Sequence, residues 1–208
     1  MSTSTPNDPI PGRPRVATRK RGTKETDIGV TVSVDGSGRN EISTGLPFFD
    51  HMLDQLGRHG GMDLTVSAVG DLHVDGHHTV EDTAILVGET LREALGDKVG
   101  VRRFASGLYP LDEALVEVAL DLSGRPFLVY DVPFGEVLPL GDPPFNPEMV
   151  EHFFRSFVDA AQITLHLTKR RGTNTHHVIE ATFKGVARCL RDAVRVESDE
   201  LPSTKGAL

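Results

Sequence analysis

Hydrophobic residues alternate with polar ones in four short segments of the chain. The alternation runs through residues 28–34 and 115–122, and it recurs through 64–68 and 163–167. A period of two places successive side chains on opposite faces of a strand, so each segment predicts a β-strand with one buried face. These strands form two pairs, one in each half of the chain.

A different period marks two longer segments. In residues 77–95 and 176–194 the apolar side chains recur at three- and four-residue spacing, which is typical of a helix with one buried face. Gly96 follows the first segment and predicts its end. The second strand of each pair is preceded by a further predicted helix, and the proline-rich residues 132–148 predict a loop.

These elements predict an α+β protein of two halves, each a sheet with two helices packed on one face. We expect the first half to span residues 15–100 and the second 101–200, followed by a C-terminal tail at 201–208. Residues 1–14 lack the apolar run of a signal peptide, so they predict a disordered N-terminal tail.

The two halves are also similar in sequence. Residues 77–95 align with 176–194 without a gap, and both begin with two histidines followed, three residues after the second, by a glutamate. Further upstream, 25–38 resembles 113–124, each an acid followed by alternation and a glycine turn. The chain is therefore an internal duplication.

The repeated histidines suit metal binding. On a helix, positions four apart lie on nearly the same face, whereas adjacent positions are turned by about 100°. His77 can therefore share a metal ion with Glu81 while His78 points toward another, and the second motif repeats this pattern. His51 and His152, which precede the motifs by 26 and 24 residues, complete six histidines and two glutamates. This set divides into two sites of three nitrogens and one oxygen, although either motif alone could also be a polar helix start.

Composition limits the classes of protein. The 208 residues are 38% hydrophobic, contain no tryptophan and carry a formal charge of −8, which predicts small cores and further surface buried between subunits. The net charge argues against a general nucleic-acid binder, although residues 15–21 are basic and predict a solvated strand or an anion-facing surface. No apolar run reaches the roughly 18 residues that cross a membrane. The single Cys189 predicts a core residue in a reducing cytoplasm.

Five motifs carry a wider resemblance: LPFFDHMLDQ (46–55), DLHVDGHHTVED (71–82), SGRP (123–126), NTHHVIEATFK (174–184) and PSTKG (202–206). With these motifs the chain, from about Arg15 to the C-terminus, resembles the imidazoleglycerol-phosphate dehydratases of L-histidine biosynthesis. The resemblance implies a ribosomal protein S5 domain 2-like fold. It also implies a hydro-lyase that removes water from D-erythro-imidazole glycerol phosphate and gives imidazole acetol phosphate.

The resemblance further implies two Mn²⁺ per active site in a cytoplasmic homo-oligomer of 24 subunits, with active sites between neighbouring subunits and no nucleic-acid or membrane partner. Ligand chemistry alone does not select manganese, because imidazole-rich sites suit zinc, iron or nickel at least as well. One metal ion would be bound by residues matching His51, His78, His176 and Glu180. The other would be bound by residues matching His77, Glu81, His152 and His177.

Glu25 matches the residue that transfers the proton in this family, although without the resemblance it would be interpreted as a solvated acid at the start of a strand. The other implied substrate contacts are cations and hydrogen-bond donors, which suit a phosphate dianion. With Glu25, the substrate-contacting residues implied by the resemblance are Gln55, His59, Arg103, Arg125, Lys184, Ser203, Thr204 and Lys205.

Two other classes of function use similar ligands. A binuclear metallohydrolase would activate water between its metals, but such a site usually has more carboxylates and a bridging acid. A metal-storage or structural metal protein is the second alternative, but it has no need of Glu25, His59 or a group of phosphate-binding residues.

Overall fold

The computed structural model describes residues 15–135, 138–206 and 208, so the predicted tail at 1–14 lies outside the described residues. The first half contains β1 (Val16–Gly22), β2 (Thr26–Ser33), β3 (Asn40–Ser43), α1 (Pro47–Gly60), β4 (Asp63–Gly70) and α2 (His77–Leu95). The second half contains β5 (Phe104–Leu111), β6 (Ala114–Asp121), β7 (Phe127–Asp131), α3 (Met149–Ala161), β8 (Thr164–Arg171) and α4 (Thr175–Ala193).

The two halves have the same topology. Each contributes a four-stranded sheet, with strand orders β1-β2-β4-β3 and β5-β6-β8-β7. In each sheet the last two strands in this order are parallel and the other pairs are antiparallel. The parallel strands are joined by a crossover helix, α1 in the first half and α3 in the second. This common topology agrees with the predicted duplication.

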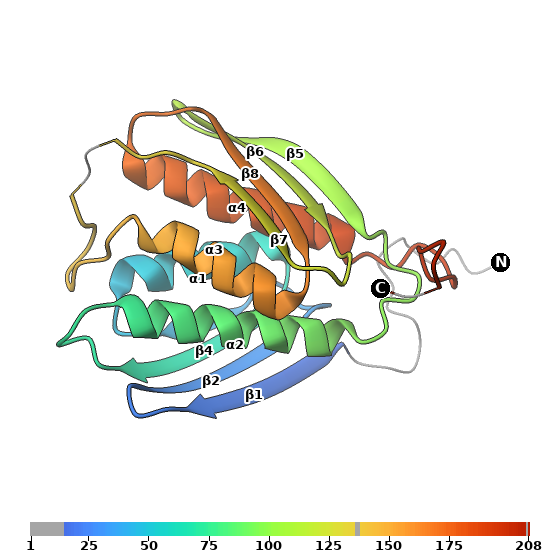
Figure 1. Cartoon of the computed structure of the whole chain (residues 1–208), viewed down its shortest axis with the longest axis horizontal. Helices are drawn as coiled ribbons and strands as arrows, with labels where there is room; N and C mark the ends of the chain where they lie inside the picture. The colour runs from blue at the N-terminus through green and yellow to red at the C-terminus, as the bar shows by residue number, and fades with distance from the viewer. Residues whose placement is uncertain (1–14, 136–137, 207) are drawn as a thin grey trace.

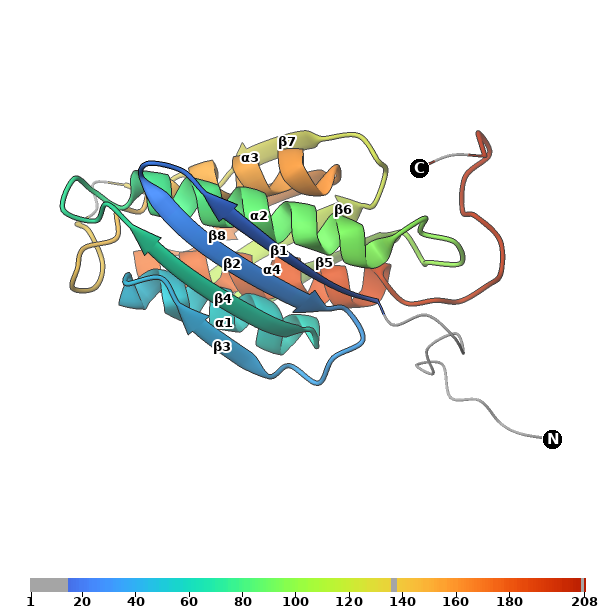
Figure 2. The same ribbon diagram turned by 90° about the horizontal axis from the view of Figure 1, so that it is seen from below.

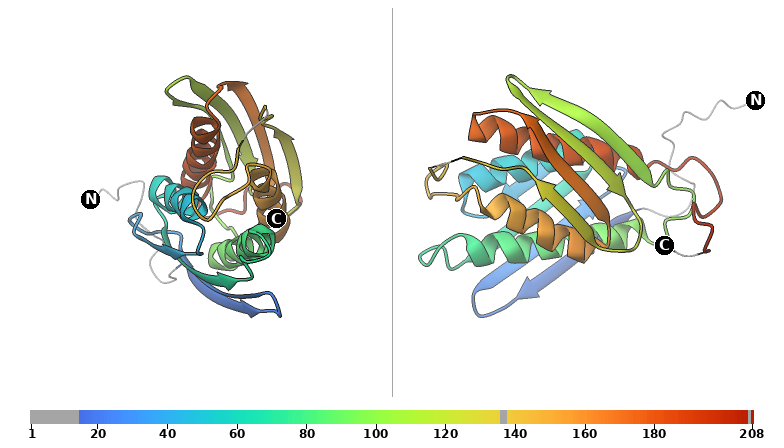
Figure 3. Two further views of the ribbon diagram at one scale, coloured as in Figure 1. Left: turned by 90° about the vertical axis from the view of Figure 1, so that its left-hand side faces the viewer. Right: turned by 45° about the horizontal axis from the view of Figure 1, so that its top comes forward.

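The two sheets lie on the outside of the molecule, and all four helices lie between them (Figure 1; Figure 3, left). Each sheet is therefore covered by helices on one face, as predicted, and Figure 2 shows the open face of the first sheet. Across the centre α2 packs along α3 and α1 packs along α4. Buried side chains from both halves form one hydrophobic cluster. Among the described residues, no helix is long and apolar enough to cross a membrane.

The sequence pattern predicted β2, β4, β6 and β8 but did not identify β3, β5 or β7 as strands. These are edge strands or short strands that bury little of their surface, so the alternation of apolar and polar residues is weak. The basic segment 15–21 falls on β1, which buries only Ala17. Two of its arginines face acids of α2: Arg19 pairs with Glu89 and Glu93, and Arg21 pairs with Asp82.

The direction of the helices determines where functional groups lie. The four helices begin at one end of the molecule, at the left in Figure 1, and the turns β1–β2 and β5–β6 lie at the same end. The segment after α4, with the C-terminus, lies at the opposite end (Figure 1). Side chains in the first turns of the helices are therefore separated from the C-terminal tail by the length of the helical layer.

Candidate metal centre

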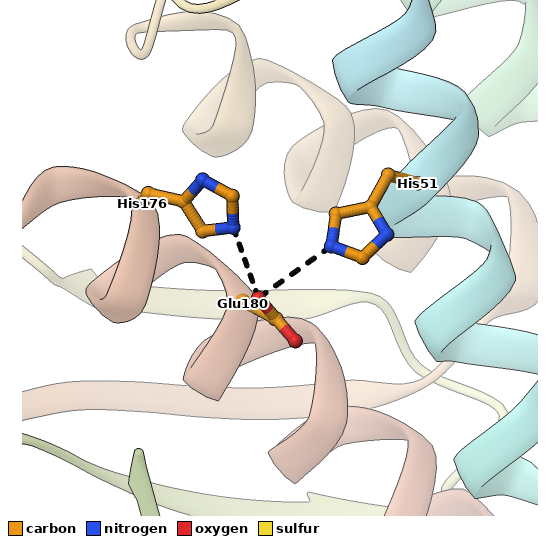
Figure 4. A group of neighbouring side chains, drawn as sticks. All are labelled: His51, His176 and Glu180. Atoms are coloured by element: carbon orange, nitrogen blue, oxygen red, sulfur yellow. Dashed lines mark hydrogen bonds and ion pairs between the residues drawn. The ribbon is translucent and has the colours of Figure 1, made fainter. Parts of the chain in front are cut away.

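One group of metal-binding side chains lies where α1 packs against α4. His51 extends from α1, and His176 and Glu180 extend from successive turns of α4 (Figure 4). The Glu180 Oε2 atom lies 3.0 Å from His176 Nε2 and 3.5 Å from His51 Nε2. The Glu180 side chain is 13% exposed, while both imidazoles are 42% exposed. The carboxylate of this group is therefore mostly covered, whereas its histidines face solvent.

A second group lies where α2 packs against α3. Glu81 lies 3.5 Å from His152 through Oε1 and 4.0 Å from His77 through Oε2, in both cases measured to Nε2. The rings of His77 and His152 are 4.3 Å apart. His152 Nε2 is buried and makes no hydrogen bond. A buried nitrogen without a hydrogen bond is costly unless another partner, such as a metal ion, is bound there.

Both groups have the chemistry of a metal site. In each, two imidazoles and one carboxylate offer ligand atoms that lie within 4.8 Å of one another. Each contains three of the four residues expected from the sequence. The remaining histidines, His78 and His177, belong to neither group within the chain. Each group also joins a lone histidine from one half to a helical pair from the other half.

His78 and His177 are each held by a carboxylate. Asp71 Oδ2 lies 2.9 Å from His78 Nδ1, and Glu113 Oε2 lies 2.7 Å from His177 Nδ1. These hydrogen bonds lower the pKa of Asp71 and lower that of Glu113 to about 2, and they raise the pKa of both histidines. With Nδ1 bound in this way, Nε2 of each ring is left to bind a metal ion.

Asp75 and Asp82, the aspartates that stand closest to the first histidine pair in the sequence, do not hold these rings. In the structure Asp75 instead accepts a hydrogen bond from the backbone N–H of His77 at the start of α2. Asp82 accepts one from Thr26 and pairs with Arg21. The actual partners of the histidines lie in connections that follow β4 and β5, and no spacing rule on a helix could have identified them.

Glu25 directly precedes β2 and lies at the same end of the molecule as the histidines. Its side chain is 54% exposed, and its Oε2 atom lies 4.0 Å from His78 Nε2. The carboxylate is therefore close to the atom of His78 that remains free to bind a metal ion. A ligand bound there would be within reach of Glu25.

Three of the expected substrate-contacting residues lie close to the first group. Gln55 Nε2 is 3.4 Å from His51 Nδ1, and Lys184 Nζ is 2.6 Å from Glu180 Oε1. Burial raises the pKa of Glu180, but the hydrogen bond and charge of Lys184 outweigh burial and the pKa is lowered. Glu180 is therefore ionised, as a metal ligand must be. Burial, together with the charge of Lys184, also lowers the pKa of His59.

The other expected substrate-contacting residues lie at the opposite end of the molecule. Arg103 binds both carboxylate oxygens of Asp121, at 2.7 and 3.1 Å, and donates to the carbonyl oxygen of Pro202 at 2.7 Å. Arg125 lies 4.0 Å from Asp121 and is 63% exposed. The tail residues Ser203, Thr204 and Lys205 follow Pro202 directly. Within one chain, these cations do not meet the histidine groups.

The fold and the two groups define a class: a duplicated α+β protein able to bind metal ions through histidine and glutamate side chains. Comparison with known proteins makes the identification specific. Residues 44–190 match the model of the imidazoleglycerol-phosphate dehydratase family. The imidazoleglycerol-phosphate dehydratase of Acidothermus cellulolyticus is 55% identical over 199 residues, 95% of each chain. That of Methanopyrus kandleri is 52% identical over 194 residues, 93% of this chain and 96% of its own.

Solved structures that are similar to this chain belong to the same kind of enzyme as its sequence relatives. The crystal structure of the dehydratase from Staphylococcus aureus is 35% identical, covers 86% of this chain and 97% of its own, and has a TM-score of 0.76. The enzyme from Pyrococcus furiosus is 35% identical, covers 91% of this chain and 100% of its own, and has a TM-score of 0.77. The chain belongs to the imidazoleglycerol-phosphate dehydratase family. It is a metal-dependent hydro-lyase of histidine biosynthesis, and neither a metallohydrolase nor a metal store.

Proposed function

We propose that the chain removes water from imidazole glycerol phosphate, giving imidazole acetol phosphate, with two Mn²⁺ ions in each active site. The proposal rests on the two His/Glu groups. Each is assembled from both halves, and its ligand atoms lie within 4.8 Å of one another. One ion would be bound by His51, His176, Glu180 and a copy of His78. The other would be bound by His77, Glu81, His152 and a copy of His177.

The fourth ligands would come from other subunits. His78 and His177 lie apart from both groups, and a carboxylate holds the Nδ1 atom of each. Their Nε2 atoms lie 4.0 Å from Glu25 and 3.8 Å from Asp112, which is beyond hydrogen-bond distance. Such histidines suit a site completed by a neighbouring copy of the chain, and a closed assembly of 24 subunits would supply these contacts. The single buried Cys189 is compatible with the cytoplasm.

The substrate would contact residues from opposite ends of the folded chain, which would belong to two different copies. Bound metal ions would stabilise negative charge on the imidazole ring. Glu25 would move a proton at the carbon chain, and Gln55 and His59 would contact the substrate near the first group. Lys184 is 2.6 Å from Glu180 and would also reach substrate there. The phosphate would be held by Arg103, Arg125, Ser203, Thr204 and Lys205 of another copy.

This arrangement assigns a task to each part of the chain. The repeats at 15–100 and 101–200 would each contribute ligands to both metal sites, because the two groups combine helices of different halves. The C-terminal tail at 201–208 would contact the substrate phosphate rather than the metal ions. The partner at the active site is thus a small phosphorylated imidazole together with further copies of this chain.

The decisive experiment measures product formation from imidazole glycerol phosphate by Mn²⁺-loaded parent protein and by Glu25→Gln. The substitution keeps the shape of the side chain but removes the group that accepts the proton. Loss of general acid–base catalysis is typically worth about 10²–10⁴ in rate, so we expect turnover to fall by that factor with metal content and substrate affinity nearly unchanged.

Glu41→Gln is a matched control, because Glu41 is an exposed glutamate on β3. We expect this variant to turn over like the parent. A Glu25→Gln protein within a few-fold of the parent would show that another group carries the proton. A parent protein that binds Mn²⁺ but forms no product would refute the proposed function itself.

A further inference from the structure

The two histidines that lie outside the metal groups have matching surroundings. In each case one carboxylate binds Nδ1, and a second carboxylate lies near Nε2 but beyond hydrogen-bond distance. For His78 these are Asp71 at 2.9 Å and Glu25 at 4.0 Å. For His177 they are Glu113 at 2.7 Å and Asp112 at 3.8 Å.

The two carboxylates that bind Nδ1 do not occupy equivalent positions in the duplication. Glu113 directly precedes β6, and the residue in the same place before β2 is Glu25. Asp71 lies six residues before the first histidine pair, and the corresponding residue of the second half is Arg170. Arg170 cannot accept a hydrogen bond from a histidine, and it binds Glu117 at 2.6 Å.

This difference changes what the equivalent glutamates do. Glu113 binds His177 and also accepts hydrogen bonds from the backbone N–H groups of Thr173 and Asn174, at 3.2 and 2.8 Å. Both of its carboxylate oxygens therefore accept hydrogen bonds at the start of α4. Glu25 has no such bonds, because Asp71 holds the histidine of the first half. Its exposed carboxylate therefore remains available to a ligand.

We propose that Asp71 and Glu113 are positioning residues that aim the Nε2 atoms of His78 and His177 at their metal ions, and that Asp71 releases Glu25 for proton transfer. The first part is a general requirement: a hydrogen bond to one ring nitrogen fixes the orientation and tautomer of a ligating imidazole. The second part rests on the proposed function, since it assigns Glu25 a role in catalysis. After duplication, one turn glutamate holds a ligand and its counterpart performs chemistry.

Two isosteric variants test the positioning role. Asp71→Asn and Glu113→Gln retain the side-chain shape but replace a charge-assisted hydrogen bond with a weaker neutral one. Loss of such a partner typically weakens metal binding about 10–100-fold, so calorimetric titration with Mn²⁺ should show this loss in both variants. Glu117→Gln is the control, because Glu117 pairs with Arg170 on the same sheet and touches no histidine. It should bind Mn²⁺ like the parent.

The two variants should differ once Mn²⁺ is saturating. Glu113→Gln should recover turnover to within about threefold of the parent, because Glu25 is untouched. In Asp71→Asn the freed ring of His78 can turn and bind Glu25, as His177 binds Glu113. Turnover should then stay about tenfold or more below the parent although the metal sites are filled. Light scattering and circular dichroism should show both variants folded and assembled at saturating Mn²⁺.

The other possible outcomes contradict different parts of the proposal. Parent-like Mn²⁺ affinity in both folded variants would refute the positioning role. Recovery of full turnover by both variants would leave positioning intact but refute the release of Glu25. A parent protein without dehydratase activity would refute the proposed function, whereas the metal titrations would still report on Asp71 and Glu113.

Discussion

At the scale of single residues, carboxylates with the same chemistry have different tasks because their neighbours differ. Glu180 is 13% exposed and pairs with Lys184, which suits a permanent anionic ligand. Asp121 pairs with Arg103, and Glu113 pairs with His177. Glu25 is more than half exposed and contacts only a histidine at 4.0 Å. A carboxylate that moves protons must be free to approach the substrate, so this exposure favours Glu25.

Arg125 offers a test of phosphate recognition at the same scale. Its side chain is 63% exposed, donates one hydrogen bond to the carbonyl oxygen of Ser123 at 3.1 Å and lies 4.0 Å from Asp121. The other donors of the guanidinium can bind a phosphate dianion through charge-assisted hydrogen bonds. We expect Arg125→Ala to bind a ring mimic such as triazole as well as the parent does, and to bind phosphate-bearing substrate about tenfold or more weakly. Calorimetric titration of both ligands into both proteins measures the difference.

The control for this comparison is Arg39→Ala, because Arg39 is 82% exposed and pairs with Asp63. It should leave both affinities unchanged. Equal losses for the two ligands in Arg125→Ala would instead assign Arg125 a structural role.

At the scale of secondary-structure elements, the first turns of the helices carry the metal-binding residues, and the packing of helices across the halves brings them together. His77 and Glu81 of α2 meet His152 of α3, and these two helices pack along one another. Close packing of the helices therefore maintains the second site. Gly88 is central to this contact, because a Cβ atom there would lie 2.7 Å from the carbonyl oxygen of Phe157.

We therefore expect Gly88→Ala to separate α2 from α3 and to destabilise the protein by about 1–3 kcal/mol, as overpacked cores do. An alanine in a helix would otherwise stabilise it by up to about 1 kcal/mol. The added methyl group would also lie 2.8 Å from Ala160 Cβ and 2.9 Å from Ala161 N, so backbone as well as side chain must move. Thermal unfolding at fixed Mn²⁺ and protein concentration measures this effect.

The matched variant is Arg92→Ala, which changes an exposed position on the same helix. It should unfold within about 0.5 kcal/mol of the parent. If Gly88→Ala were as stable as this control, the two helices would have room to adjust without loss of packing.

At the scale of the whole molecule, one chain does not bring all of the expected site residues together. The histidine groups lie at the end where the helices begin, and Arg103 and the C-terminal tail lie at the other end (Figure 1). His78 and His177 are also absent from the groups formed within the chain. Both features are explained if neighbouring copies complete each site, and metal binding should then stabilise the assembly by mass action.

We expect His77→Ala and His176→Ala to lower metal content and to loosen the oligomer as well as to reduce turnover. Chelation of the parent should have the same effect, and added Mn²⁺ should restore both assembly and activity. Light scattering combined with metal analysis measures these changes. His166→Ala is the control, because His166 is an exposed histidine on β8 outside both groups. An intact full-size assembly with normal metal content in both ligand variants would contradict the prediction.

The sequence alone determined the features that depend on local periodicity. Alternation predicted β2, β4, β6 and β8, and three- and four-residue spacing predicted α2 and α4 almost to the residue. The same helical period placed His77 with Glu81, four residues apart on one face, because the backbone geometry of a helix does not depend on the rest of the fold. The family was also recognisable from the motifs, since they span nearly the whole chain.

Tertiary structure decided what depends on residues distant in the sequence. Residue spacing could not show that His51 joins the pair on α4 and that His152 joins the pair on α2, because this follows from the packing of helices of different halves. Nor could it identify Asp71 and Glu113 as partners of His78 and His177. Such contacts arise where a connection at the end of the strands meets the start of a helix, and their formation depends on how the sheet and helix layers are stacked.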